Sequence, residues 1–273
     1  MNAATVLPAL CAIARSAGAA IMEVYGREHT VELKADHSPL TQADRVSHEL
    51  IRRGLAGLPQ ALPVLSEESP PEALTRRREW TRYWLVDPLD GTKEFIKRNG
   101  EFTVNIALID NHSAVAGVVL APALGRLYYG AVGHGAWQED GAQGPRAVQV
   151  RAAAAAPVRV VGSRSHPSGA LAGYLAALGP HAITAMGSSL KICLIAAGEA
   201  DIYPRFGPTS EWDTAAAQAI LESAGGRMID LAGRPLRYNT KDELLNPHFL
   251  AFGDQRRDWL APFRNESGRE DRN

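Results

Sequence analysis

The chain has 273 residues, of which 45% are hydrophobic and 22% are charged, as in a folded globular protein with one large core or two smaller ones. The formal net charge of -1 excludes a general electrostatic attraction to nucleic acid or to an anionic membrane. Cys11 and Cys193 lie among apolar residues, which predicts buried thiols rather than a disulfide, so we expect a cytoplasmic protein.

The N-terminal region predicts two helices. Apolar residues recur at spacings of three and four from Val6 to Val24, and they line one face of a long first helix. This segment lacks a basic n-region, contains Arg15 and continues into Glu23, so we expect neither a signal peptide nor a membrane-spanning helix. Residues 41–58 predict the second helix.

Strand patterns follow these helices. Two short apolar stretches that end in acidic residues predict buried strands, and three β-rich segments come after them. The five segments are residues 62–69, 82–88, 103–110, 114–122 and 125–132. A sheet is therefore expected in the first half of the chain.

Strands and helices alternate in the second half of the chain. The expected strands are 158–163, 182–187, 201–206 and 226–231, and the expected helices are 168–178, 188–198 and 212–224. This alternation predicts an α/β half, and the fold class of the whole chain is α/β (α+β). We expect one unit over residues 1–263, with subdomains of about 1–150 and 151–263, followed by a polar tail, 264–273.

The stretch WLVDPLDGTKEF, residues 84–95, contains two aspartates three residues apart. A continuous strand would point Asp87 and Asp90 to opposite faces. Pro88 removes a ladder donor, so we expect the strand to end there and the chain to turn, which brings both carboxylates and the Leu89 carbonyl toward one point. Gly91 permits the tight geometry that begins a turn or a helix.

Such a pair of carboxylates requires a cation. At about 4 Å they repel by roughly 4 kcal/mol at an effective dielectric constant near 20. Ligands that are all oxygen suit Mg²⁺ or Mn²⁺ better than zinc. The alternative is that Asp90 caps a helix beside a solvated Asp87.

Two further acids have positions typical of α/β active sites. Glu67, in VLSEES, follows an apolar strand, and Asp213, in SEWDTAAAQAIL, begins a helix. Taken singly, Glu67 is equally explained as a solvated side chain, and Asp213 as a helix cap.

Together, the ordered motifs SEES, DPLDGT and WDTAAA closely resemble those of the inositol monophosphatase superfamily of metal-dependent, lithium-sensitive phosphatases. The stretches KADHSPLTQAD, SRSHPSG and GSSLKICLIAAGEADIYPR, with the run from Tyr83 to Ile109, are most similar to its CysQ-type 3'(2'),5'-bisphosphate nucleotidases. The similarity covers roughly residues 5–253 and implies a layered α-β-α-β-α sandwich.

The resemblance implies a metal centre with two or three Mg²⁺ ions, for which Mn²⁺ is the expected substitute. Glu67, Asp87 and the Leu89 carbonyl would hold one ion, and Asp87, Asp90 and Asp213 would hold a second. Glu67 would also lie near a third, weaker ion that some members bind.

The resemblance also implies the catalytic pair. The hydroxyl of Thr92 is not acidic enough to be a base on its own, so Asp44 would accept its proton and leave its lone pairs aimed at the attacking water. Without the resemblance, Asp44 is as well explained as a first-turn helix acid that the helix dipole favours.

A bisphosphorylated nucleotide carries a second phosphate that needs its own cations, which Lys191 and Arg205 would supply. Each of the two, taken alone, is more often a solvated surface cation. The substrate contacts implied by the resemblance are Glu67, Leu89, Asp90, Gly91, Thr92, Ser163, His166, Ser188, Lys191, Arg205 and Asp213.

The expected reaction is hydrolysis of the 3'-phosphate of adenosine 3',5'-bisphosphate to AMP and phosphate, with 3'-phosphoadenylyl sulfate as a second substrate. Such an enzyme would clear a by-product of sulfate activation. One alternative is an inositol or sugar phosphate monoesterase, and another is a non-catalytic nucleotide or metal sensor on the same scaffold.

The expected partner is therefore a small-molecule nucleotide and not a nucleic acid, and related proteins include monomers and dimers. Some relatives are assigned to the cytoplasmic face of the inner membrane. The sequence has no basic amphipathic stretch that would explain such attachment.

Overall fold

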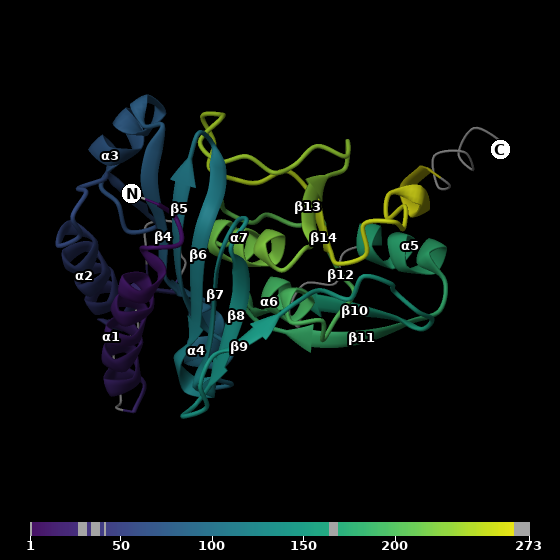
Figure 1. The fold of residues 1–273 in the computed structure, drawn as a ribbon, viewed down its shortest axis with the longest axis horizontal. Coiled ribbons are helices and arrows are strands. Elements are labelled where there is room, and N and C mark those ends of the chain that lie inside the picture. Colours follow the sequence, from purple (N-terminus) through teal and green to yellow (C-terminus); the bar gives the residue numbers. More distant parts are fainter. Residues whose placement is uncertain (1, 27–31, 34–38, 41, 164–168, 265–273) are drawn as a thin grey trace.

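The computed structural model describes residues 2–26, 32–33, 39–40, 42–163 and 169–264. Its main elements form layers in the order helix, sheet, helix, sheet, helix, which confirms the predicted α/β (α+β) sandwich (Figure 1). The helices are α1 (Leu7–Tyr25), α2 (Gln42–Ala56), α3 (Pro71–Arg76), α4 (Thr92–Ile96), α5 (Gly169–Leu178), α6 (Leu190–Ala196) and α7 (Ala215–Ser223), with 3-10 turns η1 (Arg77–Glu79) and η2 (Pro122–Leu124).

The first sheet has seven strands in the order of the chain. All neighbouring pairs are antiparallel except β3 and β4, which run parallel. The strands are β3 (Val64–Ser66), β4 (Arg82–Asp90), β5 (Thr103–Asp110), β6 (Ser113–Ala121), β7 (Arg126–Ala131), β8 (Gly135–Asp140) and β9 (Arg146–Val148). A separate two-stranded ladder joins β1 (Glu32–Leu33) to β2 (Pro39–Leu40).

The second sheet has five strands and a mixed order. Strand β10 runs parallel to both β11 and β12, whereas β14 is antiparallel to both β12 and β13. In spatial order the strands are β11 (His181–Met186), β10 (Val158–Ser163), β12 (Ile202–Arg205), β14 (Phe249–Phe252) and β13 (Arg227–Asp230). The strand β14 is not predicted from the sequence, because four apolar residues without flanking periodicity do not distinguish a strand from other buried chain.

Helices α1 and α2 cover the outer face of the first sheet (Figure 1). By length and composition alone α1 would also suit a membrane span. Its apolar stripe, which includes Leu10, Ala14, Ala17 and Ile21, is instead buried in the core against the first sheet, and core helices of globular proteins meet the same criterion.

Helices α6 and α7 lie between the two sheets, and α5 covers the outer face of the second (Figure 1). One continuous buried cluster joins side chains of both sheets to these two helices. Helix α7 approaches the first sheet very closely at β6, since a Cβ on Gly117 would lie 2.1 Å from the carbonyl oxygen of Ala216. The beginning of α7 is therefore fixed relative to the strands of the first sheet.

Candidate active site

The aspartate pair lies on one strand that contains a β-bulge. Asp87 and Asp90 are three residues apart, but their partners on β5, Asn105 and Thr103, are only two apart. The extra residue in β4 returns the second aspartate to the face of the first, because side chains alternate along a strand. The prediction that the strand ends at Pro88 is wrong: β4 continues through a bulge, where proline is tolerated.

Asp213 joins this pair from the second half of the chain. One carboxylate oxygen each from Asp87, Asp90 and Asp213 lie within 4.8 Å of one another. Burial raises the pKa of Asp87 well above its usual range, and the negative charges of Glu67, Asp90, Asp213 and Asp44 raise it further. Burial and the negative charge of Asp90 also raise the pKa of Asp213. The structure thus concentrates negative charge that is unfavourable without a cation.

Helix α2 packs beside the bulge and is hydrogen-bonded to its backbone. Asp44 is fully buried, and its charge contributes to the raised pKa of Asp87. One turn later, the buried hydroxyl of Ser47 donates a hydrogen bond of 2.7 Å to the carbonyl oxygen of Pro88. The backbone N–H of Leu89 donates to the Asp87 carboxylate at 3.0 Å. These bonds fix the backbone between the two aspartates.

A left-handed glycine follows the bulge. Gly91 has φ of 90°, and a Cβ there would lie 3.3 Å from the carbonyl oxygen of Glu101, so the turn favours glycine. Helix α4 begins at the next residue, Thr92, whose hydroxyl donates to the carbonyl oxygen of Leu89 over a long 3.5 Å. The turn therefore brings the Thr92 hydroxyl back toward the backbone between the two aspartates.

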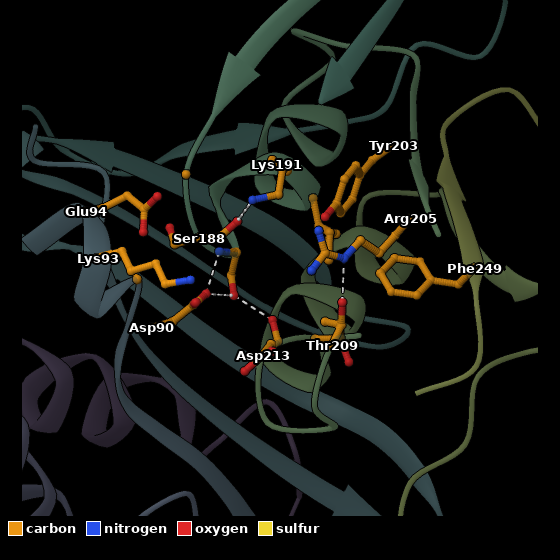
Figure 2. Close-up of a pocket in the computed structure, with 15 residues that line it drawn as sticks. Asp90, Lys93, Glu94, Ser188, Lys191, Tyr203, Arg205, Thr209, Asp213 and Phe249 are labelled. Atoms are coloured by element: carbon orange, nitrogen blue, oxygen red, sulfur yellow. Dashed lines mark hydrogen bonds between the residues drawn. The ribbon is translucent and has the colours of Figure 1, made fainter. Parts of the chain in front are cut away.

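A pocket with a volume of about 140 Å³ opens next to Asp90 and Asp213. Lys191 and Arg205 line its other side, as Figure 2 shows. Lys191 is 8% exposed, and its ammonium group donates to the carbonyl oxygen of Ser188 at 2.6 Å. Burial, opposed by Asp90, lowers the pKa of Lys191 to about 8. Lys191 and Arg205 therefore lie opposite Asp90 and Asp213, in a pocket that Lys93 and Glu94 also line.

The side chain of Arg205 is held by its own loop. Its Nε donates to the Thr209 hydroxyl at 2.6 Å, and its Nη2 donates to the Pro208 carbonyl oxygen at 2.6 Å. The aromatic rings of Tyr203 and Phe249 also line the pocket. Arg205 is thus oriented before any ligand binds.

Sequence reasoning missed several residues of this pocket, chiefly Ser189. The hydroxyl oxygen of Ser189 lies 2.7 Å from Asp90 Oδ2 and 2.6 Å from the carbonyl oxygen of Asp213. Lys93, Glu94, Tyr203, Thr209 and Phe249 were missed as well. The pair of serines in GSSLKIC was the available signal for Ser189, but nothing local tells which serine faces the acids.

Two predicted contacts remain, Ser163 on strand β10 and His166. Ser163 is the last residue of that strand, and its side chain is not part of the described structure. His166 lies outside the described residues. Both stay predictions.

The acid cluster has the ligand chemistry of a hard cation. Its three close donors are all carboxylates, and Mg²⁺ and Mn²⁺ favour oxygen ligands. Burial and the neighbouring acids both disfavour the charged form of Asp87, which is why its pKa is raised. A divalent cation would offset this charge, so the residues present fit the group.

Layered fold and acid cluster together define a class of protein. The family model of the inositol monophosphatase family matches residues 2–261, and the chain belongs to this family. The metal-dependent phosphatase fold expected from the three acidic motifs is therefore confirmed.

The similarity extends to one branch of the family. The chain is 53% identical over 246 residues to the 3'(2'),5'-bisphosphate nucleotidase CysQ of Salmonella typhimurium, covering 89% of this chain and 98% of that protein. Identity to CysQ of Escherichia coli strain K12 is 52% over 246 residues, with 89% and 98% covered. A crystal structure of CysQ from Bacteroides thetaiotaomicron superposes with a TM-score of 0.81 at 42% identity, covering 93% of this chain and 98% of that chain. The predicted resemblance to CysQ-type members is confirmed.

Proposed function

We propose that the protein is a metal-dependent 3'(2'),5'-bisphosphate nucleotidase. It hydrolyses the 3'-phosphate of adenosine 3',5'-bisphosphate to AMP and phosphate, and also that of 3'-phosphoadenylyl sulfate. The observation that carries the proposal is the meeting of Asp87, Asp90 and Asp213 beside a pocket that also contains Lys191 and Arg205. The printed names of the CysQ relatives support the same substrate class.

Two or three Mg²⁺ ions, or Mn²⁺ in their place, would be held by Glu67, Asp87, the Leu89 carbonyl, Asp90 and Asp213. When bound, such ions neutralise charge on the phosphate ester and its leaving oxygen and lower the pKa of the attacking water. The close carboxylate oxygens of Asp87, Asp90 and Asp213 support three members of this ligand set.

The water is oriented by the chain itself in this proposal. The bond from the Thr92 hydroxyl to the Leu89 carbonyl is long at 3.5 Å, so little is lost when the hydroxyl turns away. Asp44, buried in α2, would then accept the Thr92 proton, and the Thr92 oxygen would accept a hydrogen from the attacking water. The backbone N–H groups of Gly91 and Thr92 would bind phosphate oxygens.

The second phosphate of the nucleotide would bind between Lys191 and Arg205. Both line the pocket, and Arg205 is already oriented by bonds to its own loop. A preorganised cation loses less entropy on binding an anion than a free side chain does. Ser188, Ser163 and His166 complete the proposed contacts to the nucleotide.

We propose that residues 1–263 act as one phosphatase unit in the cytoplasm. The buried cluster shared by the two sheets and helices α6 and α7 supports a single unit, with subdomains that meet at the site. Attachment to the inner membrane has no support in the comparisons. Fractionation of cells into soluble and membrane parts would test it.

Phosphate release tests the function directly. We expect fast Mg²⁺-dependent release from adenosine 3',5'-bisphosphate, slow release from inositol 1-phosphate, and inhibition of both by Li⁺. A preference for inositol 1-phosphate would instead identify a monoesterase of the same family. Binding of the bisphosphate without any phosphate release would identify a sensor and refute the proposed activity.

A further inference from the structure

Ser189 connects two segments of the site that come from different halves of the chain. It precedes α6 and is 3% exposed. Its backbone N–H donates to Asp90 Oδ2 at 2.7 Å, and its hydroxyl oxygen lies 2.7 Å from the same carboxylate oxygen. That hydroxyl oxygen is also 2.6 Å from the carbonyl oxygen of Asp213. One side chain thus contacts both Asp90 and the backbone of Asp213.

The hydroxyl of Ser189 has one hydrogen, so it donates to only one of these two acceptors at a time. It also accepts a hydrogen bond of 2.8 Å from the amide of Asn105, the bulge partner of Asp87 on β5. Because the Ser189 N–H already binds Asp90, the hydroxyl can donate to Asp213 without releasing the Asp90 carboxylate. Both the hydroxyl and the backbone N–H of Ser189 are therefore hydrogen-bonded to protein groups.

The turn that carries Ser189 is itself fixed. The N–H of Gly187 donates to the Glu101 carboxylate at 2.7 Å, and a Cβ on Gly187 would lie 2.6 Å from the Glu101 carbonyl oxygen. Ser188 has φ of 45°, in the left-handed region that side chains rarely adopt. A turn so constrained sets the position of Ser189 and, through it, the position of the acids.

We propose that Ser189 is a positioning residue for the metal centre, which holds Asp90 and the Asp213 segment at the separation that a divalent cation requires. This inference rests on the proposed function. It assigns to Ser189 an effect on the affinity for Mg²⁺ and none on nucleotide contacts, because its hydrogen bonds go to the acids and to Asn105. Groups that orient metal ligands contribute about 10- to 100-fold to metal affinity.

The test compares Ser189→Ala with the wild-type enzyme in a Mg²⁺ titration. We expect the Mg²⁺ concentration at half-maximal phosphate release to rise by about 10-fold. The KM for adenosine 3',5'-bisphosphate at saturating Mg²⁺ should stay unchanged. Without nucleotide, the Mg²⁺ concentration that half-maximally raises the Tm should shift by the same factor. This second readout does not depend on turnover.

Two further variants separate positioning from general destabilisation. Ser189→Thr keeps the hydroxyl and should restore the wild-type Mg²⁺ midpoint. Ser223→Ala removes a hydroxyl that donates to the Ala219 carbonyl oxygen at 2.6 Å within α7, and should leave the midpoint unchanged. A folded Ser189→Ala enzyme with the wild-type Mg²⁺ midpoint in both readouts would overturn the inference.

Failure of the inference is distinct from failure of the proposed function. If the wild-type enzyme releases phosphate and only the midpoint of Ser189→Ala fails to move, the role of Ser189 is wrong and the nucleotidase activity stands. If the wild-type enzyme releases no phosphate, the proposed function is wrong, and the Tm titration still decides whether Ser189 controls Mg²⁺ affinity.

Discussion

Replacing Asp87 by asparagine should stabilise the metal-free protein. Asp87 is 1% exposed, and burial and the neighbouring acids, Glu67 first, raise its pKa well above the usual range. Asparagine removes the charge but keeps the oxygen that accepts the 3.0 Å bond from the N–H of Leu89. The substitution therefore removes repulsion with little change in shape.

The magnitude follows from the separation of the charges. Two ionised carboxylates within 4.8 Å of each other repel by about 3 kcal/mol or more at an effective dielectric constant near 20, and Asp87 has two such neighbours, Asp90 and Asp213. The destabilisation by this repulsion is limited to about 4 kcal/mol, because that is the free energy needed to protonate an aspartate of ordinary pKa at pH 7. The new amide must also be hydrated or bonded, at about 1–3 kcal/mol. We expect a net gain of about 2 kcal/mol in the free energy of unfolding.

The pH dependence of stability tests whether the charge of Asp87 destabilises the metal-free protein. A carboxylic acid with a raised pKa binds its proton more tightly in the folded state, so the stability of the metal-free protein falls as pH rises above about 4. Asp87→Asn should weaken this pH dependence. Saturating Mg²⁺ should reverse the order of stability, because the wild-type protein binds the ion more tightly.

Urea denaturation in EDTA at pH 5 and pH 7.5, and again in Mg²⁺, measures these differences. Asp201→Asn is the matched control: Asp201 is also 1% exposed, but it accepts bonds of 3.0 Å from Arg151 and 2.8 Å from the N–H of Arg159. The Asp201→Asn variant should have a free energy of unfolding about 3 kcal/mol lower than the wild type, with or without Mg²⁺. The reasoning is refuted if Asp87→Asn is less stable than the wild type in EDTA at pH 7.5.

Three further predictions concern the site and its support. Asp90→Asn should keep the circular dichroism spectrum and lower kcat/KM in Mg²⁺ by about a thousandfold, the equivalent of roughly 4 kcal/mol of charge interaction; near-normal turnover would contradict the proposed metal centre. Because the pKa of Lys191 is lowered to about 8 by burial, the wild-type KM for the bisphosphate should rise above that pH. Lys191→Met should have a KM about 10-fold higher or more, with no such rise, and a parallel pH profile would exclude this role. Gly117→Ala should lower the free energy of unfolding by about 3 kcal/mol, because its Cβ would meet the Ala216 carbonyl oxygen, whereas Gly144→Ala meets nothing within 4 Å and serves as the control in the same urea titration.

The sequence by itself determined most of the elements and the kind of chemistry. The apolar stripe from Val6 to Val24 and the strand pattern of 103–110 depend on periodicities that neighbours along the chain impose, so both appear where they are expected. The identities of Glu67, Asp87, Asp90 and Asp213 likewise indicate oxygen ligands wherever the chain places them.

Only the tertiary structure decided how these groups meet. The face of Asp90 depends on a bulge that exists because β4 pairs with β5, and the position of Asp213 depends on α7 packing at Gly117. Ser189 gains its partners only when the two halves come together. Local sequence fixes dihedral preferences over a few residues, whereas these contacts join positions as far apart in the chain as Asp87 and Asp213, and only packing of the whole core selects them.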